Sequence, residues 1–297
     1  MIRLRVPATS ANMGPGFDCM GVALNLYNEF EFEEIKSGLK FEGFEEEFCN
    51  KNNIVYKAMM EVFKRTHYPF NGLKIKLVKN NIPIARGLGS SSSCIVAGIY
   101  GANYISKKKL TEEELLDLAV DIEGHPDNVA PAILGGIVIA IRCEKKVIYE
   151  KIENKKKLEF ISVIPDFKLE TEEVRSILPK KLTYEDSVYN IGRATLLAIG
   201  LNNGNTDVLR EACKDRLHEP YRNSLIKGID LIKKEAYNSG ALASYLSGAG
   251  PTINIIVKES FKVRNALIKV LKDEGLNYKV IGLSTDTKGV IVLEGGK

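Results

Sequence analysis

The chain has 297 residues, of which 44% are hydrophobic and 27% are charged, a composition typical of an ordinary globular protein. Its 42 basic residues are interspersed with 38 acidic ones, and the net charge of +4 creates no single-sign field for a nucleic-acid or membrane partner. This length allows one large domain or two medium domains, each with its own core.

The chain also lacks the usual marks of secretion and membrane insertion. Its five cysteines lie far apart without a Cys-x-x-Cys spacing, which favours reduced thiols in an intracellular protein and argues against a zinc site. The N-terminus has no apolar signal-peptide core, and the longest nearly apolar run, 129–141, is shorter than the roughly 20 residues that cross a bilayer. We therefore expect a cytoplasmic protein.

In the first half of the chain, the periodicity of apolar residues predicts strands and helices that follow one another along the sequence. Alternation predicts a strand at 2–6, followed by a loop over 7–18, and a further strand at 73–77. A helix over 91–104 is apolar almost all round, which indicates burial beneath a sheet. A capping box starts the next helix at 111, and a glycine ends it at 124.

A charged segment over 144–157 is the predicted boundary between an N-terminal domain at 1–155 and a C-terminal domain at 156–297. Beyond it we predict strands at 158–164, 242–246, 252–258, 278–283 and 288–293, and helices at 188–201, 206–214, 223–238 and 261–274. Because strands and helices interleave throughout, the predicted fold class is α+β with two layers.

The glycine- and serine-rich loop before the buried helix has the composition of a phosphate-binding cradle. It consists of Pro83, Ile84, Ala85, Arg86, Gly87, Leu88, Gly89, Ser90, Ser91, Ser92 and Ser93. Its glycines allow close approach of a ligand, the N–H groups at the start of the helix point at an anion, and a serine hydroxyl can ligate Mg²⁺. The alternative is an ordinary turn before a helix.

The loop over 7–18 is a second candidate site. Its glycines and proline determine a tight course that places Asn12 and Asp18 as fixed polar groups. The Asp18 carboxylate is suited to a substrate ammonium group, whereas the alternative is an Asx-turn that only holds the loop together. The residues leave both interpretations open.

Two further motifs carry polar groups or glycines at the ends of predicted elements. Glu123 lies at the inward edge of its helix, where a carboxylate needs a partner such as Mg²⁺. His125, a single histidine without another ligand at a recognised spacing, is expected to be a hydrogen-bonding residue rather than a metal ligand. The turn over 247–252 is either a hairpin with a bulge or a backbone wall against a ligand.

Familiar phosphate-binding motifs do not account for the loop at 83–93. No lysine follows its glycines as in a P-loop, and Ser92 stands where a dinucleotide fingerprint has its third glycine. The His-Arg-Asp and Asp-Phe-Gly signatures of protein kinases are absent from the sequence. The remaining interpretation of this loop is that it belongs to a kinase of a different architecture.

Taken together, Pro-x-x-x-Gly-Leu-Gly-Ser-Ser at 83–91, the proline and glycine loop at 7–18 and Gly-Ala-Gly-Pro at 248–251 resemble the three motifs of the GHMP small-molecule kinases. Within that superfamily, Gly-Pro-Gly-Phe-Asp at 14–18 and Glu-Gly-His-Pro-Asp-Asn-Val-Ala-Pro at 123–131 are most similar to the homoserine kinase family. The resemblance implies a two-domain GHMP kinase fold, with a ribosomal-protein-like N-terminal domain, a ferredoxin-like C-terminal domain and a cleft between them.

The resemblance also implies roles for individual residues. It assigns the loop at 83–93 to the phosphates of ATP, and Ser93 and Glu123 to Mg²⁺, with the register among the serines at 90–93 left open. It implies that L-homoserine is the substrate, with Asp18 on its amine and two arginines on its carboxylate. The carboxylate-binding arginines would be Arg193 and Arg222, and the remaining polar wall would comprise Asn12, His125, Asp127 and Asn128.

The expected product is O-phospho-L-homoserine, an intermediate of threonine biosynthesis. Mevalonate kinases carry a lysine in the first loop and an aspartate base after the metal-binding glutamate, whereas here Asn128 stands at the base position. Positioning and charge neutralisation can supply most of the acceleration in phosphoryl transfer, so we expect no strong base, with Asp127 as the rival base.

Two alternatives to a homoserine kinase follow from the same motifs. One is a GHMP kinase for mevalonate or a sugar, and the other is a non-catalytic ligand sensor on the same fold. The resemblance further implies a homodimer.

Overall fold

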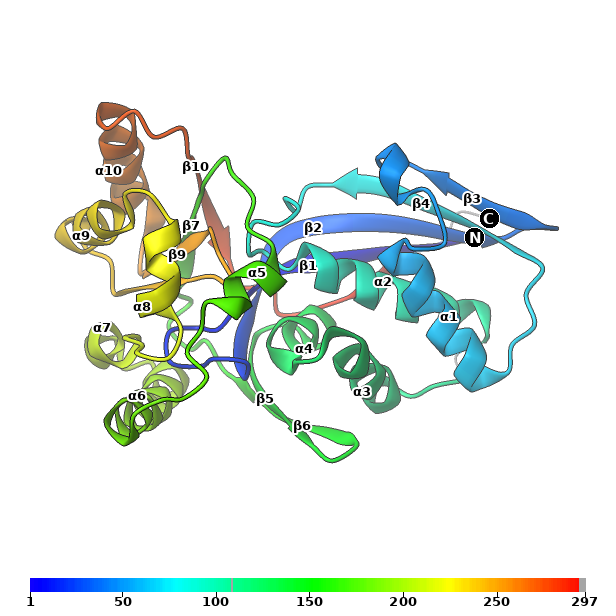
Figure 1. The fold of residues 1–297 in the computed structure, drawn as a ribbon, viewed down its shortest axis with the longest axis horizontal. Helices are drawn as coiled ribbons and strands as arrows, with labels where there is room; N and C mark the ends of the chain where they lie inside the picture. Colours follow the sequence, from blue (N-terminus) through cyan, green and yellow to red (C-terminus); the bar gives the residue numbers. More distant parts are fainter. Residues whose placement is uncertain (108, 294–297) are drawn as a thin grey trace.

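The computed structural model describes residues 1–107 and 109–293. It contains two sheets that lie next to each other (Figure 1). The first sheet has seven strands in the order β11-β1-β2-β4-β3, with β5 joined to β2 and β6 joined to β5. These strands are β1 (Ile2–Ala11), β2 (Met20–Glu34), β3 (Gly38–Glu42), β4 (Gly72–Asn80), β5 (Ile137–Cys143), β6 (Lys146–Ile152) and β11 (Ile291–Leu293).

Four helices cover one face of this sheet (Figure 1). They are α1 (Ile54–Thr66), α2 (Ser90–Ile105), α3 (Glu112–Glu123) and α4 (Pro126–Leu134). Leu4, Phe30 and Ile75 of the strands belong to one buried cluster with Ile95 and Ile99 of α2. The predicted burial of this helix is therefore confirmed, because side chains on most of its circumference are removed from water.

The junction between α3 and α4 is important for the site. The predicted capping box is confirmed, since Thr111 and Glu114 bond reciprocally at the start of α3. Gly124 ends this helix with a left-handed φ of 94°, and α4 starts two residues later with Pro126. One helix end and the next helix start thus form a single corner that presents Glu123, His125 and Asp127.

The second sheet contains four antiparallel strands in the order β10-β7-β9-β8. They are β7 (Glu159–Ile164), β8 (Ala243–Leu246), β9 (Ile253–Val257) and β10 (Lys279–Ser284). Helix α9 (Ile229–Ser239) precedes β8, and α10 (Ser260–Asp273) connects β9 to β10. This βαββαβ succession and strand order are those of a ferredoxin-like domain, and the α+β fold with two layers is confirmed.

A long connection between β7 and α9 adds further helices on the side of the second sheet (Figure 1). Its helices are α5 (Thr171–Ser176), α6 (Tyr184–Asn203), α7 (Leu209–Ala212) and α8 (Glu219–Arg222). Short 3₁₀ turns lie at Glu46–Phe48, Thr206–Val208 and Asn223–Leu225. No helix in the described ranges is long and apolar enough to cross a membrane.

The largest differences between the predicted elements and the structure occur in three places. Strand β1 continues to Ala11, because after a bulge at Pro7 and Ala8 it resumes pairing with β2, so the first loop begins at Asn12. The predicted helix at 223–238 begins only at Ile229, since Gly228 has a left-handed φ of 75°. The predicted helix at 206–214 is a 3₁₀ turn followed by one α-helical turn.

The two sheets are also linked by the last described strand. After β10, the chain returns to the first sheet, where β11 pairs antiparallel with β1 at Arg3 and Leu293. The predicted domain boundary between 155 and 156 stays a prediction. The two ends of the described chain are joined in one sheet.

Candidate active site

A cavity of about 110 Å³ lies where loops of both sheets meet. Its walls come from the loop after β1, the loop that leads into α2, the corner between α3 and α4, the start of α5 and the turn between β8 and β9. Four of these five segments, all except the start of α5, are motifs singled out in the sequence. The fold therefore brings together glycine-rich turns that are far apart in the chain.

The glycine loop is held rigidly against the second sheet. Gly87 has a φ of 74°, and a Cβ there would lie 2.3 Å from the carbonyl oxygen of Ser247, so only glycine fits. The Ser247 hydroxyl donates to the carbonyl of Gly87 at 2.5 Å. Arg86 donates to the carbonyls of Pro165 and Asp166 at 3.0 and 2.7 Å. These contacts fix the backbone conformation of the loop.

A second, larger cavity of about 550 Å³ adjoins the other side of this loop. The two cavities share Ala85, Ser90, Ser91, Leu169 and Thr171. Since the first N–H groups of α2 are not used within the helix and carry the positive end of its dipole, the loop offers an anion site between a large and a small compartment. A nucleotide fits this division, with its base and sugar in the larger cavity and its phosphates at the loop.

Glu123 lies opposite one serine of the loop. The hydroxyl of Ser92 donates to Oε1 of Glu123 at 2.6 Å. Burial raises the pKa of Glu123, and the hydrogen bond from Ser92 and the nearby His125 only partly offset it. A carboxylate in such a place is stabilised by a cation, and a carboxylate and a hydroxyl oxygen are hard ligands suited to Mg²⁺.

Ser93 does not face this carboxylate. It is fully buried, and its hydroxyl donates to the carbonyl of Ser90 at 2.8 Å and accepts from Nδ2 of Asn28 at 3.2 Å. Ser91 and Ser92 line the cavity. The assignment of Ser93 to Mg²⁺ stays a prediction, and the geometry favours Ser92.

Asn12 and Asp18 combine a structural contact within their loop with a position at the cavity. The two residues have left-handed φ values of 56° and 57°, which Asn and Asp tolerate better than most residues. Oδ1 of Asn12 accepts from the backbone N–H of Asp18 at 2.8 Å and so holds the loop together. The Asp18 side chain lines the cavity, where it accepts a hydrogen bond from Nη2 of Arg175.

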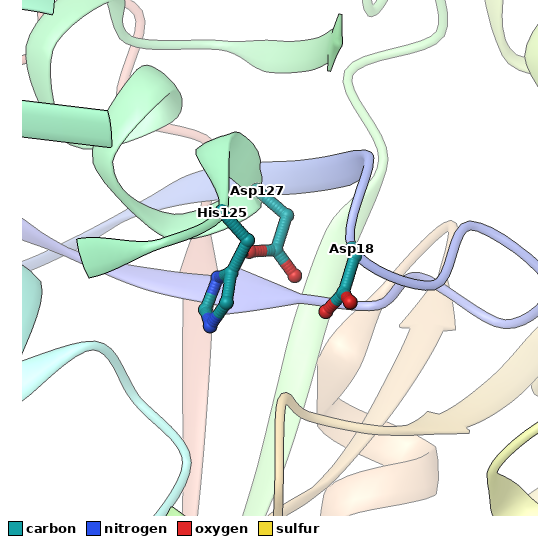
Figure 2. Close-up of side chains that lie close together, drawn as sticks. All are labelled: Asp18, His125 and Asp127. Atoms are coloured by element: carbon teal, nitrogen blue, oxygen red, sulfur yellow. The ribbon is translucent and has the colours of Figure 1, made fainter. Parts of the chain in front are cut away.

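His125 and Asp127 form a pair beside Asp18 (Figure 2). Nδ1 of His125 lies 2.7 Å from Oδ1 of Asp127. Asp127 is 1% exposed, and no described residue donates to its Oδ2. Burial alone would lower the pKa of His125, but hydrogen bonding and charge from Asp127, together with Asp18 and Glu123, raise it. The three carboxylates of Asp18, Glu123 and Asp127 outnumber this one imidazole and give this wall of the cavity a negative character.

Two arginines provide the opposite charge. Arg222 is 2% exposed and donates from Nη1 to the carbonyl of Gly248 at 3.1 Å. Burial and the neighbouring Arg175 lower the pKa of Arg222 to about 10, so it remains a cation at neutral pH. The guanidinium groups of Arg222 and Arg175 both lie over the ring of Phe17, at 5.3 and 5.4 Å from its centroid respectively.

Arg193, the other arginine predicted to bind a carboxylate, is not among the residues that line the cavity. Its guanidinium carbon lies 3.3 Å from the centroid of the Tyr189 ring, and its Nη2 lies 4.0 Å from Glu211. Arg175 lines the cavity together with Arg222, and Arg86, which also lines it, donates to the backbone carbonyls of Pro165 and Asp166, so the geometry favours Arg175 as the partner of Arg222. The sequence offered no signal for Arg175, because it is a single arginine in a short, largely polar segment.

Most of the other predicted site residues do meet at the cavity. Those that line it are Asn12, Asp18, Ala85, Arg86, Gly87, Gly89, Ser90, Ser91, Ser92, Glu123, His125, Asp127, Asn128 and Arg222. Oδ1 of Asn128 accepts from the Thr9 hydroxyl at 2.8 Å. Of the remaining loop residues, Ile84 lines the larger cavity and Leu88 is buried in the core.

The turn between β8 and β9 also reconciles two alternatives. Leu246 and Ile253 pair across it as an antiparallel hairpin. At the same time Gly248, Ala249 and Gly250 line the cavity, so the turn is both a hairpin connection and a backbone wall.

Comparison with known proteins identifies relatives over the whole chain. Residues 53–136 match the N-terminal domain of GHMP kinases, and residues 195–274 match their C-terminal domain. A homoserine kinase of Clostridium beijerinckii is 54% identical over 298 residues, which cover 100% of both chains. A homoserine kinase of Clostridium botulinum is 52% identical over 99% of both chains.

Solved structures agree with this result. The homoserine kinase of Cytophaga hutchinsonii has a TM-score of 0.89 and 28% identity, covering 98% of this chain and 97% of that one. The mevalonate kinase of Methanococcus jannaschii has a TM-score of 0.71 over 95% of this chain and 98% of that one, but at 17% identity it shows only that the fold is shared.

Proposed function

The chain belongs to the GHMP kinases, in the homoserine kinase family, and on this basis we propose how its cavity transfers a phosphoryl group from ATP to the side-chain hydroxyl of L-homoserine. The observation that carries the proposal is a cavity with carboxylates on one side and guanidinium groups on the other, directly beside the phosphate loop. A zwitterion with a terminal hydroxyl matches this arrangement. The product is O-phospho-L-homoserine.

The two charged ends of the substrate have complementary partners. Asp18 and Oδ2 of Asp127 face the position proposed for the ammonium group, and Arg175 and Arg222 that for the carboxylate. A planar guanidinium can donate two parallel hydrogen bonds to a carboxylate. Holding both ends directs the hydroxyl toward the glycine loop.

Magnesium fits the residues at the other end of the cavity. Glu123 and Ser92 would hold it, with Ser91 beside them, because they supply a buried carboxylate and a hydroxyl oxygen at the edge of the phosphate loop. When bound, Mg²⁺ neutralises charge on the transferring phosphates.

We propose that the transfer proceeds without a strong base. Oδ1 of Asp127 is occupied by His125, and Asp127 faces the position proposed for the substrate amine, while Asn128 lies beside it as a neutral amide. Alignment and charge neutralisation can then supply most of the acceleration. The Asp127→Asn variant tests this: a loss in turnover near a thousandfold at unchanged substrate affinity would identify Asp127 as the base.

A coupled assay of ADP release with L-homoserine, mevalonate and galactose tests the function itself. Turnover is expected with homoserine at low concentrations and at most weakly with the other two, which lack an ammonium group for Asp18. Preference for mevalonate or galactose would favour another GHMP kinase. Binding of ATP without turnover of any of the three would favour a ligand sensor.

We propose a cytoplasmic homodimer, and helix α6 supplies a surface for it. Tyr184, Val188, Ile191 and Ile199 on this helix are between 54% and 87% exposed. Their spacing of four, three and eight residues places them on one side of α6, and a Cβ added at Gly192 would have no described atom within 4 Å, so two copies of this helix could pack against each other about a two-fold axis. All five cysteines are free thiols, which suits a reducing compartment.

Analytical ultracentrifugation tests the dimer. The wild type is expected to sediment as a dimer and the Ile191→Glu variant as a folded monomer. A wild type that remains monomeric at high concentration, or a variant that remains dimeric, would contradict this interface.

A further inference from the structure

We propose that Asp18, His125 and Asp127 also bind a divalent transition-metal ion such as Zn²⁺, and that this ion inhibits phosphorylation by occupying the position of the substrate's ammonium group. The inhibition rests on the proposed function, whereas the metal site rests on the geometry of the three side chains.

One ligand atom from each of these side chains lies within 4.8 Å of the other two. In Figure 2 the Asp127 carboxylate turns toward Asp18, with the His125 ring beside it. Asp127 is 1% exposed, and within the described ranges nothing donates to its Oδ2. A buried carboxylate oxygen that faces a second carboxylate is stabilised by a cation between them.

The ligand set decides which cation is preferred. An imidazole nitrogen with two carboxylate oxygens suits Zn²⁺ and Co²⁺, which bind His and Asp at roughly 2.0–2.2 Å, and leaves the fourth position open to water. Mg²⁺ prefers oxygen ligands, and Glu123 with Ser92 offers that set. The corner between α3 and α4 would therefore separate two cations by ligand chemistry.

Arg175 opposes the metal but does not exclude it. Its guanidinium contacts Oδ2 of Asp18, which leaves Oδ1 of the same carboxylate for another ligand. The Arg175 side chain is 41% exposed and so has room to turn away. The same rearrangement is needed when the ammonium group of the substrate approaches Asp18, so metal and amine compete for one carboxylate.

Cobalt provides a direct test, because bound Co²⁺ gives visible absorption that does not depend on enzymatic activity. The full chain would carry Cys49→Ser and Cys143→Ser to remove its exposed thiols, and would be titrated with Co²⁺ without ATP. We expect one equivalent to bind. Asp127→Asn should weaken binding by more than about tenfold, the minimum loss when even an outer partner of a metal ligand is removed. Glu113→Gln, on the exposed side of α3, should leave it unchanged.

Competition then tests the link to the substrate. L-Homoserine should displace Co²⁺, and 4-hydroxybutanoate, which lacks the amine, should not. Zn²⁺ should inhibit the kinase competitively against homoserine at saturating Mg-ATP. Co²⁺ binding that is unaffected by Asp127→Asn, or that persists at saturating homoserine, would overturn the proposal. Cobalt binding lost in Asp127→Asn, in a protein that does not phosphorylate homoserine, would instead refute the proposed function and leave the metal site in place.

Discussion

Arg175 of α5 donates a hydrogen bond to Asp18 of the first loop, and this pair joins the negative and positive walls of the cavity. The Arg175 and Asp18 side chains are 41% and 35% exposed, so neither is buried in the core. A zwitterionic substrate can insert between them, because its ammonium group replaces the guanidinium on Asp18 and its carboxylate replaces Asp18 on Arg175. In the structure, the ion pair neutralises the charges of both side chains.

Replacing Arg175 by Ala should therefore raise the KM for homoserine by roughly 10- to 100-fold, the range that corresponds to about 1.5–3 kcal/mol for a hydrogen bond to a charged group. The turnover number should change less, since this contact is made equally in the ground state and the transition state. Steady-state kinetics with homoserine varied at saturating ATP measures both quantities.

Arg193→Ala is the matched control. Because Arg193 lies on the ring of Tyr189 and near Glu211, its removal should change the KM for homoserine by less than about threefold, below the loss expected for a direct charged contact. A larger effect for Arg193→Ala than for Arg175→Ala would restore the role that the family resemblance implied for Arg193.

A second pair of variants separates the serines of the phosphate loop. Ser92→Ala should raise the Mg²⁺ concentration for half-maximal activity by about tenfold, because it removes the hydroxyl 2.6 Å from Glu123. Ser93→Ala should leave that value unchanged but lower stability by about 1 kcal/mol, since the buried amide of Asn28 loses its acceptor. Activity against Mg²⁺ concentration and urea unfolding measure the two effects. A stronger change in Mg²⁺ dependence for Ser93→Ala would reverse the assignment.

These serines also show what could be predicted from the sequence. The loop was recognisable because its chemistry is contiguous, and the capping box at Thr111 was recognisable because its two partners are three residues apart. Which serine faces Glu123 depends on the rotation of α2 about its axis, and neighbouring residues differ by about 100°. That rotation is set by packing against the sheet, including the contact from Asn28 to Ser93, which local sequence rules do not contain.

The contact between Arg175 and Asp18 could not be predicted from local sequence rules either, because the two residues are far apart in the chain. Arg175 lies 157 residues from Asp18, and the contact depends on where the connection after β7 runs. The family resemblance implied Arg193 and Arg222 as the two cations for the carboxylate, whereas the geometry of the cavity favours Arg175 over Arg193. The sequence pattern does not contain this information, because the position of Arg175 is set by tertiary packing and not by spacing along the chain.

The ion pairs of Glu29 lead to a prediction about acid stability. The buried Glu29 lies between Arg3 and Lys79. Its Oε2 is 2.5 Å from Nη2 of Arg3, and its Oε1 is 2.7 Å from Nζ of Lys79. Burial alone would raise its pKa, but the hydrogen bonds from Lys79 and Arg3 lower it below the usual value. Since the folded pKa is the lower one, the stabilisation is present above the unfolded value near 4.5 and is lost as the pH falls through the folded pKa.

Glu29→Gln should therefore lower the free energy of unfolding by about 1–2 kcal/mol at pH 7, between the values for exposed and buried ion pairs. The difference from the wild type should shrink as the pH falls below 4.5. Urea unfolding at a series of pH values measures it. A difference that stays constant or grows on acidification would show that the ion pairs are not its source.

The last prediction concerns the glycine loop itself. Gly87→Ala should strongly raise the KM for ATP, because the new Cβ would lie 2.3 Å from one backbone oxygen and 2.8 Å from another, those of Ser247 and Gly250, so the loop must move. A positive φ adds a cost of roughly 1–2 kcal/mol for any side chain. Gly240→Ala isolates that second effect: its φ is 112°, but no atom of the described residues lies within 4 Å of the added Cβ. It should lower the melting temperature and leave the KM for ATP unchanged. If Gly87→Ala behaved like Gly240→Ala, the contact between the two glycine turns would not be what shapes the phosphate site.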